Sequence, residues 1–262
     1  MQKNVRSNAQ EILTAFAADE GRSAYAVAET QVGLWSGGIY EDTPRPAASL
    51  LKLVVAMALE PLIQRLEQQR VSDLLTATDI STVLRSFDPD RLLSPAEMLR
   101  LMLSASDGPC TRWAVSATGI DRIRKTLAEI DVGQTEIVID EHGMPMGITT
   151  ARNAIQLIRA VTDNQFFPIG AFSLQHSIRN SRIPLGATSP DVEIAHKTGT
   201  LTGVAHDVAR IQCANGTLWI AFLSNNQHDT LVTSYEMGCC TRALLVALGL
   251  EARTTVSADV DN

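Results

Sequence analysis

The order of hydrophobic and polar positions predicts strands near both ends of the chain and helices between them. Apolar residues at helical spacing, among them Ile12, Leu13 and Phe16, predict a helix over residues 8–20. Two strands are predicted next, at 23–29 and 33–40, with Gly37-Gly38 as punctuation in the second. A proline-containing loop at 43–46 then leads into a long apolar helix from Ser49 to about Gln69.

From about residue 72 to residue 160 the periodicity predicts helices. The clearest start is Ser94-Pro95-Ala96-Glu97, where Ser94 and Glu97 have the spacing of a capping box. Further helices are predicted at 110–117 and 121–130, and another begins at Thr149-Thr150 and continues to about Val161.

The pattern changes near Ile194, where strands are predicted at 194–200, 204–213 and 217–224, followed by a helix at 235–248. Asn215-Gly216 is a strong hairpin signal. Early and late strands can pair, so we predict an α+β fold with an antiparallel sheet flanked by the terminal helices and an all-helical lobe. The predicted division is residues 1–46 and 188–262 for the α/β lobe and 47–187 for the helical lobe. Ligands are expected between the lobes.

Composition narrows the classes of partner. The 262 residues carry a net charge of −7, and no basic stripe indicates a nucleic-acid surface. The four cysteines (110, 213, 239 and 240) lack zinc-site spacing, so we expect free thiols and no metal or cofactor. No apolar run approaches the roughly 18 residues of a membrane span. The N-terminal residues lack the apolar core of a signal peptide, which favours a cytoplasmic protein, or a periplasmic or secreted one if a leader was removed.

Candidate chemistry begins with Ser49 and Lys52, which lie three residues apart and therefore on one face of a helix. A serine hydroxyl needs a base, and a lysine in a dry site can serve because burial lowers its pKa. Two more motifs follow along the chain, at 106–108 (Ser-Asp-Gly) and 197–199 (Lys-Thr-Gly).

Together these three motifs resemble those of the serine β-lactamase and penicillin-binding protein superfamily, and most closely the class A β-lactamases. The resemblance covers residues from about 23 to 248 and implies a β-lactamase/transpeptidase-like fold. The second motif departs from the family's Ser-Asp-Asn because Gly108 replaces the asparagine. In the family that asparagine contacts the amide side chain of the substrate. Its loss removes a hydrogen bond worth about 1 kcal/mol and favours a different substrate.

The resemblance implies a role for each residue. Ser49 would attack a carbonyl carbon, Lys52 would take the serine proton, and Ser106 would relay a proton to the leaving nitrogen. The N–H groups of Ser49 and Thr200 would donate to the oxyanion. Lys197 and Thr198 would hold a substrate carboxylate, and Gly199 would leave room for the substrate beside the strand.

The group that would complete hydrolysis is less evident. Class A enzymes remove the acyl group with a glutamate on a long loop before the helix that here begins at Thr149-Thr150. The matching segment, 137–148, is shorter and lacks the Glu-x-x-Asn pattern. Glu141 is the best-positioned carboxylate in it, and the alternative is an exposed polar turn. Without a base, the acyl-enzyme should persist.

The leading hypothesis is therefore a serine hydrolase that forms an acyl-enzyme at Ser49 on a β-lactam or related small amide and deacylates slowly. Alternatives are an esterase or D-amino-acid peptidase on the same fold, and a penicillin-binding sensor with little turnover. No nucleic-acid or membrane partner is expected, and the oligomeric state stays open. His196 and His206 are predicted to be structural, whereas Arg210 is an alternative second anion partner.

Overall fold

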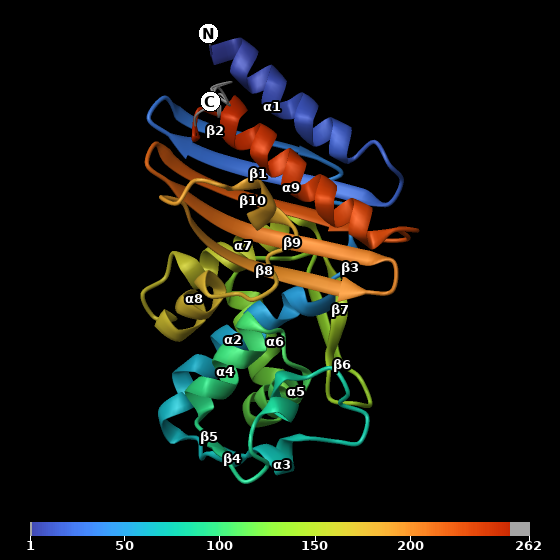
Figure 1. Cartoon of the computed structure of the whole chain (residues 1–262), viewed down its shortest axis with the longest axis vertical. Coiled ribbons are helices and arrows are strands. Elements are labelled where there is room, and N and C mark those ends of the chain that lie inside the picture. The colour runs from blue at the N-terminus through green and yellow to red at the C-terminus, as the bar shows by residue number, and fades with distance from the viewer. Residues whose placement is uncertain (1, 252–262) are drawn as a thin grey trace, which may run out of the picture.

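A five-stranded antiparallel sheet joins the two ends of the chain, in the order β2-β1-β10-β9-β8 (Figure 1). The computed structural model describes residues 2–251. Early strand β1 pairs with late strand β10, so that Ala26 lies opposite Ile220. This pairing confirms the predicted α+β fold. The strands are β1 (Arg22–Thr30), β2 (Gly33–Ile39), β8 (Glu193–Leu201), β9 (Val204–Cys213) and β10 (Gly216–Ser224).

Helices α1 (Gln2–Phe16) and α9 (Thr230–Ala247) lie side by side on one face of this sheet (Figure 1). Leu13 and Phe16 pack with Phe222 and Met237 in one buried cluster, and the rings of Phe16 and Phe222 are 4.5 Å apart. The flanking terminal helices are thus confirmed, with shifted bounds. Helix α9 begins earlier than predicted because Asp229 caps it, accepting hydrogen bonds from the N–H groups of Leu231 and Val232.

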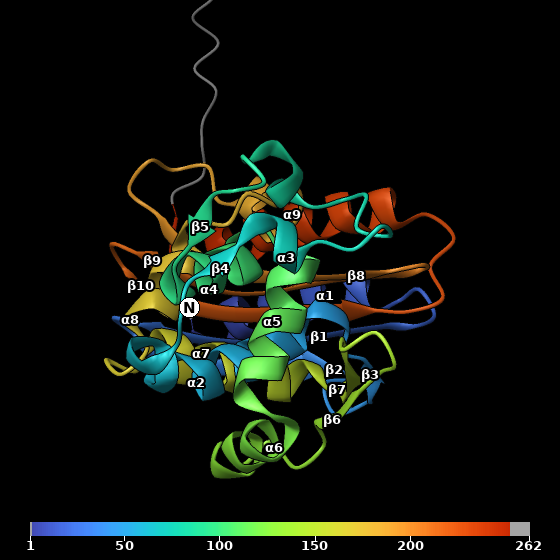
Figure 2. The ribbon, with the colours of Figure 1, turned by 90° about the horizontal axis from the view of Figure 1, so that it is seen from below.

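The other face of the sheet carries α7 (Ala151–Thr162) and leads into the helical part of the molecule, which Figure 2 shows in front of the sheet. At its centre is α2 (Lys52–Leu59), whose eight residues are all buried. A helix that is apolar all round requires neighbours on every side. These are α4 (Pro95–Ser104), α5 (Gly108–Thr118), α6 (Ile120–Glu129), α7 and α8 (Pro168–Gln175).

Several predicted helices needed correction. The long helix from Ser49 begins as a 3₁₀ turn (Ala48–Leu51), and its α-helical part ends at Leu59, since Pro61 removes a backbone donor and a 3₁₀ turn (Glu60–Arg65) follows. Residues 66–93 are mostly irregular, contrary to the predicted helical periodicity. They contain β4 (Gln69–Arg70), α3 (Val71–Leu74), a 3₁₀ turn (Val83–Ser86) and β5 (Leu92–Leu93). The capping box of α4 is confirmed, with both Ser94–Glu97 bonds present.

The segment before α7 is a β-hairpin, which the sequence analysis did not predict. Strands β6 (Glu136–Ile139) and β7 (Pro145–Thr149) pair, and β3 (Arg45–Pro46) adds a third strand along β7. A Cβ at Gly147 would lie 1.9 Å from the carbonyl oxygen of Glu136, so only glycine permits this pairing. The carbonyl of Gly147 accepts the N–H of Ala47 at 2.8 Å, which ties the hairpin to the segment that leads to Ser49.

His206 on β9 fixes the same segment from the sheet. Its Nε2 donates to the carbonyl of Pro46 at 2.6 Å, and its Nδ1 accepts the N–H of Ser224 at 3.0 Å. Both ring nitrogens are therefore used by a neutral imidazole. Burial lowers the pKa of His206 to about 4, which means that the folded protein keeps this ring uncharged at neutral pH.

The stability of the protein should therefore fall as pH drops from about 6.5 to about 4, because the unfolded chain binds a proton at His206 that the folded chain excludes. His206 should thereby lower the free energy of unfolding by on the order of 3 kcal/mol between pH 6.5 and pH 4. Urea unfolding at several pH values checks this. His206→Gln should be less stable at pH 7 but show a shallower dependence between pH 6.5 and 4. Equal slopes for the two proteins would contradict the assignment.

Candidate active site

Ser49 lies on the 3₁₀ turn that precedes α2, where strand β8 packs against it. Ala48, just before it, has the left-handed backbone conformation (φ +48°), which a residue other than glycine adopts only when its surroundings impose it. A Cβ at Gly199 would lie 3.2 Å from the Cβ of Ala48 and 3.1 Å from the ring of His206. The glycine of the Lys-Thr-Gly motif thus lets β8 approach the turn that carries Ser49.

Two buried lysines meet at the hydroxyl of Ser106. The Nζ of Lys52 donates to the Oγ of Ser106 at 3.1 Å and to its carbonyl oxygen at 2.7 Å, and the Nζ of Lys197 donates to the same Oγ at 3.0 Å. Ser106 lies between α4 and α5 and also has a left-handed backbone (φ +59°). The structure therefore brings together Lys52, Ser106 and Lys197, one from each of the three motifs.

Burial changes the acid–base properties of both lysines, which are only 2% and 1% exposed. It lowers the pKa of Lys52 to about 7, against an opposing effect of the Asp107 carboxylate, and the charge of Arg179 lowers it further. Burial and the charge of Lys52 lower the pKa of Lys197 well below its usual value. A lysine with a pKa near 7 is neutral often enough to accept a proton at physiological pH.

Asp107 organises the second motif. Its carboxylate caps α5 by accepting the N–H of Cys110 at 3.0 Å, and the hydroxyl of Thr82 donates to its other oxygen. Gly108 is the first residue of α5, and a Cβ added there would meet no atom within 4 Å. The space around the Cβ of the family's asparagine is therefore open.

Arg182, which the sequence analysis missed, binds the strand that carries the Lys-Thr-Gly motif. Its buried guanidinium donates to the carbonyl of Gly199 at 2.9 Å, to the hydroxyl of Thr200 at 2.7 Å, to the hydroxyl of Ser234 at 3.2 Å and to the carbonyl of His206. It precedes a 3₁₀ turn (Ile183–Gly186) in a loop without periodicity, so no local pattern could have marked it. Thr198 is buried, and Thr200 is exposed at the end of the motif.

His196 and Arg210 have partners within the protein. The Nδ1 of His196 lies 2.9 Å from a carboxylate oxygen of Asp207, and its Nε2 lies 3.1 Å from the Oδ1 of Asn180. The guanidinium of Arg210 is 3.4 Å from the carboxylate of Asp163, just past the end of α7. Arg210 thus already has an anionic partner, which argues against its use as a second substrate contact.

Glu141 lies in the turn between β6 and β7, with 87% of its side chain exposed. The Nε2 of His142 lies 3.6 Å from its carboxylate, and the adjacent Asp140 accepts the N–H groups of His142 and Met144. Within residues 2–251 no hydrogen bond or ion pair links Glu141 to Ser49, Lys52 or Ser106. The structure places Glu141 as an exposed turn residue rather than beside the nucleophile.

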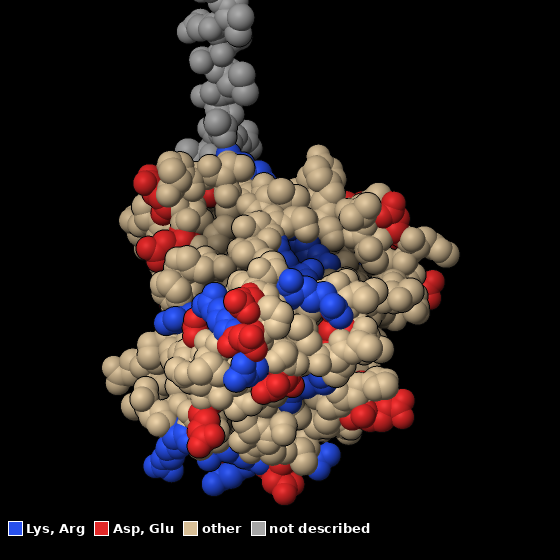
Figure 3. All heavy atoms as spheres, turned by 60° about the horizontal axis from the view of Figure 1, so that its bottom comes forward, with Lys and Arg blue, Asp and Glu red and all other residues tan. Residues whose placement is uncertain are grey.

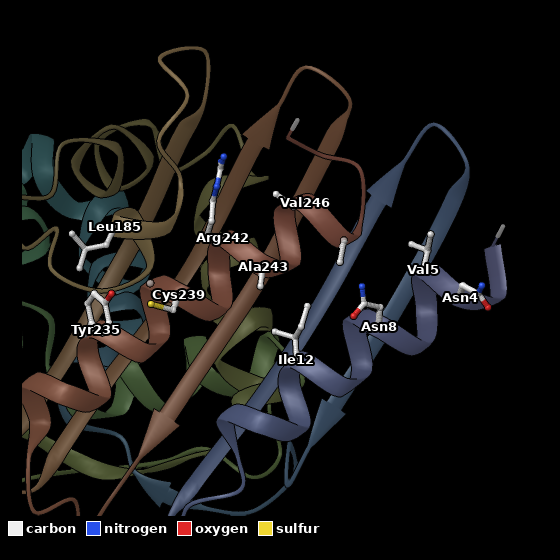
Figure 4. Close-up of a pocket in the computed structure, with 12 residues that line it drawn as sticks. Asn4, Val5, Asn8, Ile12, Leu185, Tyr235, Cys239, Arg242, Ala243 and Val246 are labelled. Carbon is white, nitrogen blue, oxygen red and sulfur yellow. The ribbon is translucent and has the colours of Figure 1, made fainter. Parts of the chain in front are cut away.

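Other candidate sites are few in the described part of the chain. No group of three or more His, Cys, Asp and Glu residues there is arranged to hold a metal ion, and all four cysteines are free. No helix between residues 2 and 251 is long and apolar enough to cross a membrane. Figure 3 shows acidic and basic side chains interspersed on one face, with Lys and Arg atoms in and beside a hollow. A groove of about 890 Å³ runs between α1 and α9, away from Ser49 (Figure 4).

The fold and the serine–lysine cluster define a protein of the serine β-lactamase and penicillin-binding protein type. The chain belongs to the β-lactamase enzyme family, whose model matches residues 5–237. The resemblance drawn from the motifs is thereby confirmed. No curated protein sequence matches the chain.

Solved structures agree in fold over nearly the whole chain. The β-lactamase from Sphaerobacter thermophilus DSM 20745 is 22% identical, with a TM-score of 0.80 over 94% of this chain and 98% of that one. PBP-A is 18% identical, with a TM-score of 0.76 over 94% and 96%. A representative class A β-lactamase from Bacteroides cellulosilyticus DSM 14838 is 14% identical, with a TM-score of 0.74 over 95% and 99%.

The lowered pKa of Lys52 can be measured directly. In protein labelled with ¹³C at the lysine ε carbons, one resonance should titrate with a midpoint near pH 7, far below that of the exposed lysines. Lys52→Met should remove this resonance, and Asp107→Asn should move its midpoint to lower pH because a neighbouring negative charge is lost. A midpoint near 10 would show that Lys52 is an ordinary charged lysine.

Proposed function

We propose that the protein is a serine hydrolase that is acylated at Ser49 by a β-lactam or related amide and releases the acyl group slowly. The observation that carries the proposal is the Ser106 hydroxyl held between the buried ammonium groups of Lys52 and Lys197. Lys52 is three residues beyond Ser49, a spacing that puts both side chains on one face of a helix, and burial lowers the pKa of Lys52 to about 7, which supports its use as the base.

Acylation proceeds in two steps. The neutral Nζ of Lys52 takes the Ser49 proton while Oγ forms a bond to the carbonyl carbon, which gives a tetrahedral oxyanion. The oxyanion then collapses and the C–N bond breaks. The leaving nitrogen receives the hydroxyl proton of Ser106, and protonated Lys52 gives its proton to the Ser106 oxygen. The products are an ester on Ser49 and an amine, which stays attached to the acyl group when the substrate is a β-lactam and leaves when it is an open-chain amide. By resemblance, the N–H groups of Ser49 and Thr200 stabilise the oxyanion.

A substrate carboxylate fits this chemistry. Lys197 and Thr198 would hold it, and a negative charge at Lys197 favours the protonated form of that lysine. Two ammonium groups on one hydroxyl repel each other, so a protonated Lys197 favours the neutral, proton-accepting form of Lys52. Substrate binding and activation of the base are thus coupled through Ser106.

Slow deacylation is supported by the exposed position of Glu141 and by the short hairpin that replaces the family's loop. A water molecule needs a positioned base to attack the ester. Among the solved structures of this fold, a mutant of PBP-A, 17% identical to this chain, is described as an acyl-enzyme complex with penicillin G. An adduct of the same kind at Ser49 is consistent with the present site.

Intact-protein mass spectrometry after mixing with penicillin G tests the proposal. The wild type should gain the mass of one penicillin and keep it, whereas Ser49→Ala should gain none. Glu141→Gln should lose the adduct at the wild-type rate, because the Glu141 carboxylate is 87% exposed and water is not held against it as it is against a buried base. No adduct and no hydrolysis would contradict acylation, and a faster wild-type release that depends on Glu141 would make it the deacylating base.

The open space at Gly108 favours an acyl group different from that of common penicillins, which keeps an esterase or D-amino-acid peptidase as the second candidate. A chromogenic cephalosporin and a short-chain nitrophenyl ester, each run beside Ser49→Ala, separate the candidates. Rapid turnover of the ester alone favours the esterase. Stoichiometric acylation without turnover of either compound favours a penicillin-binding sensor.

Gly108→Asn should restore the hydrogen bond to an acylamido side chain. Gly108 is the first residue of α5 and a Cβ there would meet no atom within 4 Å, so the variant should fold normally. We expect acylation by penicillin G to become roughly fivefold faster, the equivalent of about 1 kcal/mol. An unchanged rate in a folded variant would show that Gly108 does not set the preference for the acyl group.

A further inference from the structure

Arg179 is a cation at the active site that none of the three motifs contains. Its Nε donates to the carbonyl of Ala105 at 3.0 Å, and the Nζ of Lys52 donates to the carbonyl of the next residue, Ser106, at 2.7 Å. Adjacent α-carbons are only about 3.8 Å apart, so the two cations bind neighbouring peptide units. With Lys197 on the hydroxyl of Ser106, three basic side chains converge on two residues.

The loop that carries Arg179 is fastened to the end of α4. The N–H of Ile178 donates to the carbonyl of Ser104 at 3.1 Å, and the hydroxyl of Ser177 points to the same carbonyl at 3.4 Å. The N–H of Arg179 in turn donates to the hydroxyl of Ser177 at 3.3 Å. Arg179 is therefore positioned by the backbone around Ser106 rather than extended freely into solvent.

The two arginines beside the site differ in what they can still bind. Arg182 is buried, and its Nε and both terminal nitrogens donate to Gly199, Thr200, His206 and Ser234. Arg179 is exposed, and within residues 2–251 only its Nε donates and no carboxylate pairs with it. Its terminal nitrogens, the edge that binds carboxylates in a bidentate way, face no protein acceptor in that range.

We infer that Arg179 is a specificity-determining residue that binds a second anionic group on the leaving-group side of the substrate. This inference rests on the proposed acyl transfer at Ser49. The side follows from Ser106, which protonates the leaving group and adjoins the carbonyl that holds Arg179. Lys197 and Thr198 take one carboxylate, so the preferred substrate is an amide or ester whose leaving group carries two carboxylates. The charge of Arg179 also reaches both catalytic lysines, whose pKa values it lowers.

Three esters with the same benzoylglycyl acyl group test the inference. Their leaving groups are phenol, 3-hydroxybenzoate and 5-hydroxyisophthalate, which carry no, one and two carboxylates. For the wild type, kcat/KM should rise along this series. Arg179→Gln should lose roughly tenfold on the dicarboxylate ester and little on the other two, and Arg179→Lys should lose less, because it keeps the charge without the planar fork.

The matched control is Arg124→Gln, on an exposed position of α6, which should leave all three rates unchanged. If Arg179→Gln loses the same factor in kcat/KM on the mono- and dicarboxylate esters, the assignment of a second anion is overturned. If kcat/KM is unchanged on all three esters, any role of Arg179 in recognition is overturned. Arg179→Gln also loses the hydrogen bond to the carbonyl of Ala105. Its thermal unfolding is therefore compared with that of the wild type, and equal midpoints show that the kinetic losses do not come from unfolding.

Binding separates this inference from the proposed function. In Ser49→Ala, calorimetry with free 5-hydroxyisophthalate and 3-hydroxybenzoate should show tighter binding of the dicarboxylate, and adding Arg179→Gln should abolish that difference. If no ester acylates Ser49, the proposed function fails, and the calorimetric comparison alone then decides the role of Arg179. Equal affinity for the two anions in the presence of Arg179 would overturn the inference.

Discussion

The placement of two buried lysine amino groups on one partly buried serine hydroxyl is the constraint on which the rest of this site depends. Lys52 and Lys197 are both almost fully removed from water and share the Oγ of Ser106. Two full charges in that position would be costly, because desolvation and mutual repulsion act in the same direction. The fold therefore holds a pair whose proton is easily redistributed, which is the property that proton transfer to and from a substrate requires.

This pair exists only because segments distant in the sequence pack closely. The pairing of β1 with β10 joins the two ends of the chain, and β8 then lies at the edge of the sheet that faces the helical part. Gly199 allows β8 to contact Ala48, and His206 and Gly147 hold the segment before Ser49 from the sheet and from the hairpin. Ala48 and Ser106 have strained, left-handed backbone conformations, which the surrounding packing stabilises.

The sequence predicted the parts of this arrangement that repeat or that carry a strong local signal. Strands with alternating apolar residues, the capping box at Ser94 and the Asn215-Gly216 turn were all recognisable, and the three motifs indicated the family. The hairpin β6–β7 was missed because Gly147 and a short strand leave little periodicity. Arg179 and Arg182 were missed because both lie in an irregular loop and contact residues that are distant in the sequence. No pattern within a sequence window contains that information.

The two halves of the proposed reaction are supported by different parts of the fold. Lys52 and Lys197 extend from α2 and β8, and Asp107 caps the start of α5. All three side chains are buried, so replacing any of them also disturbs the packing of the core. Glu141 and His142, in the β6–β7 turn, are largely exposed to solvent. A surface turn can change in length and sequence at small cost in stability, whereas the buried lysines cannot be altered independently of the core. The physical organisation of the molecule therefore permits the hydrolytic step to vary while acylation is retained.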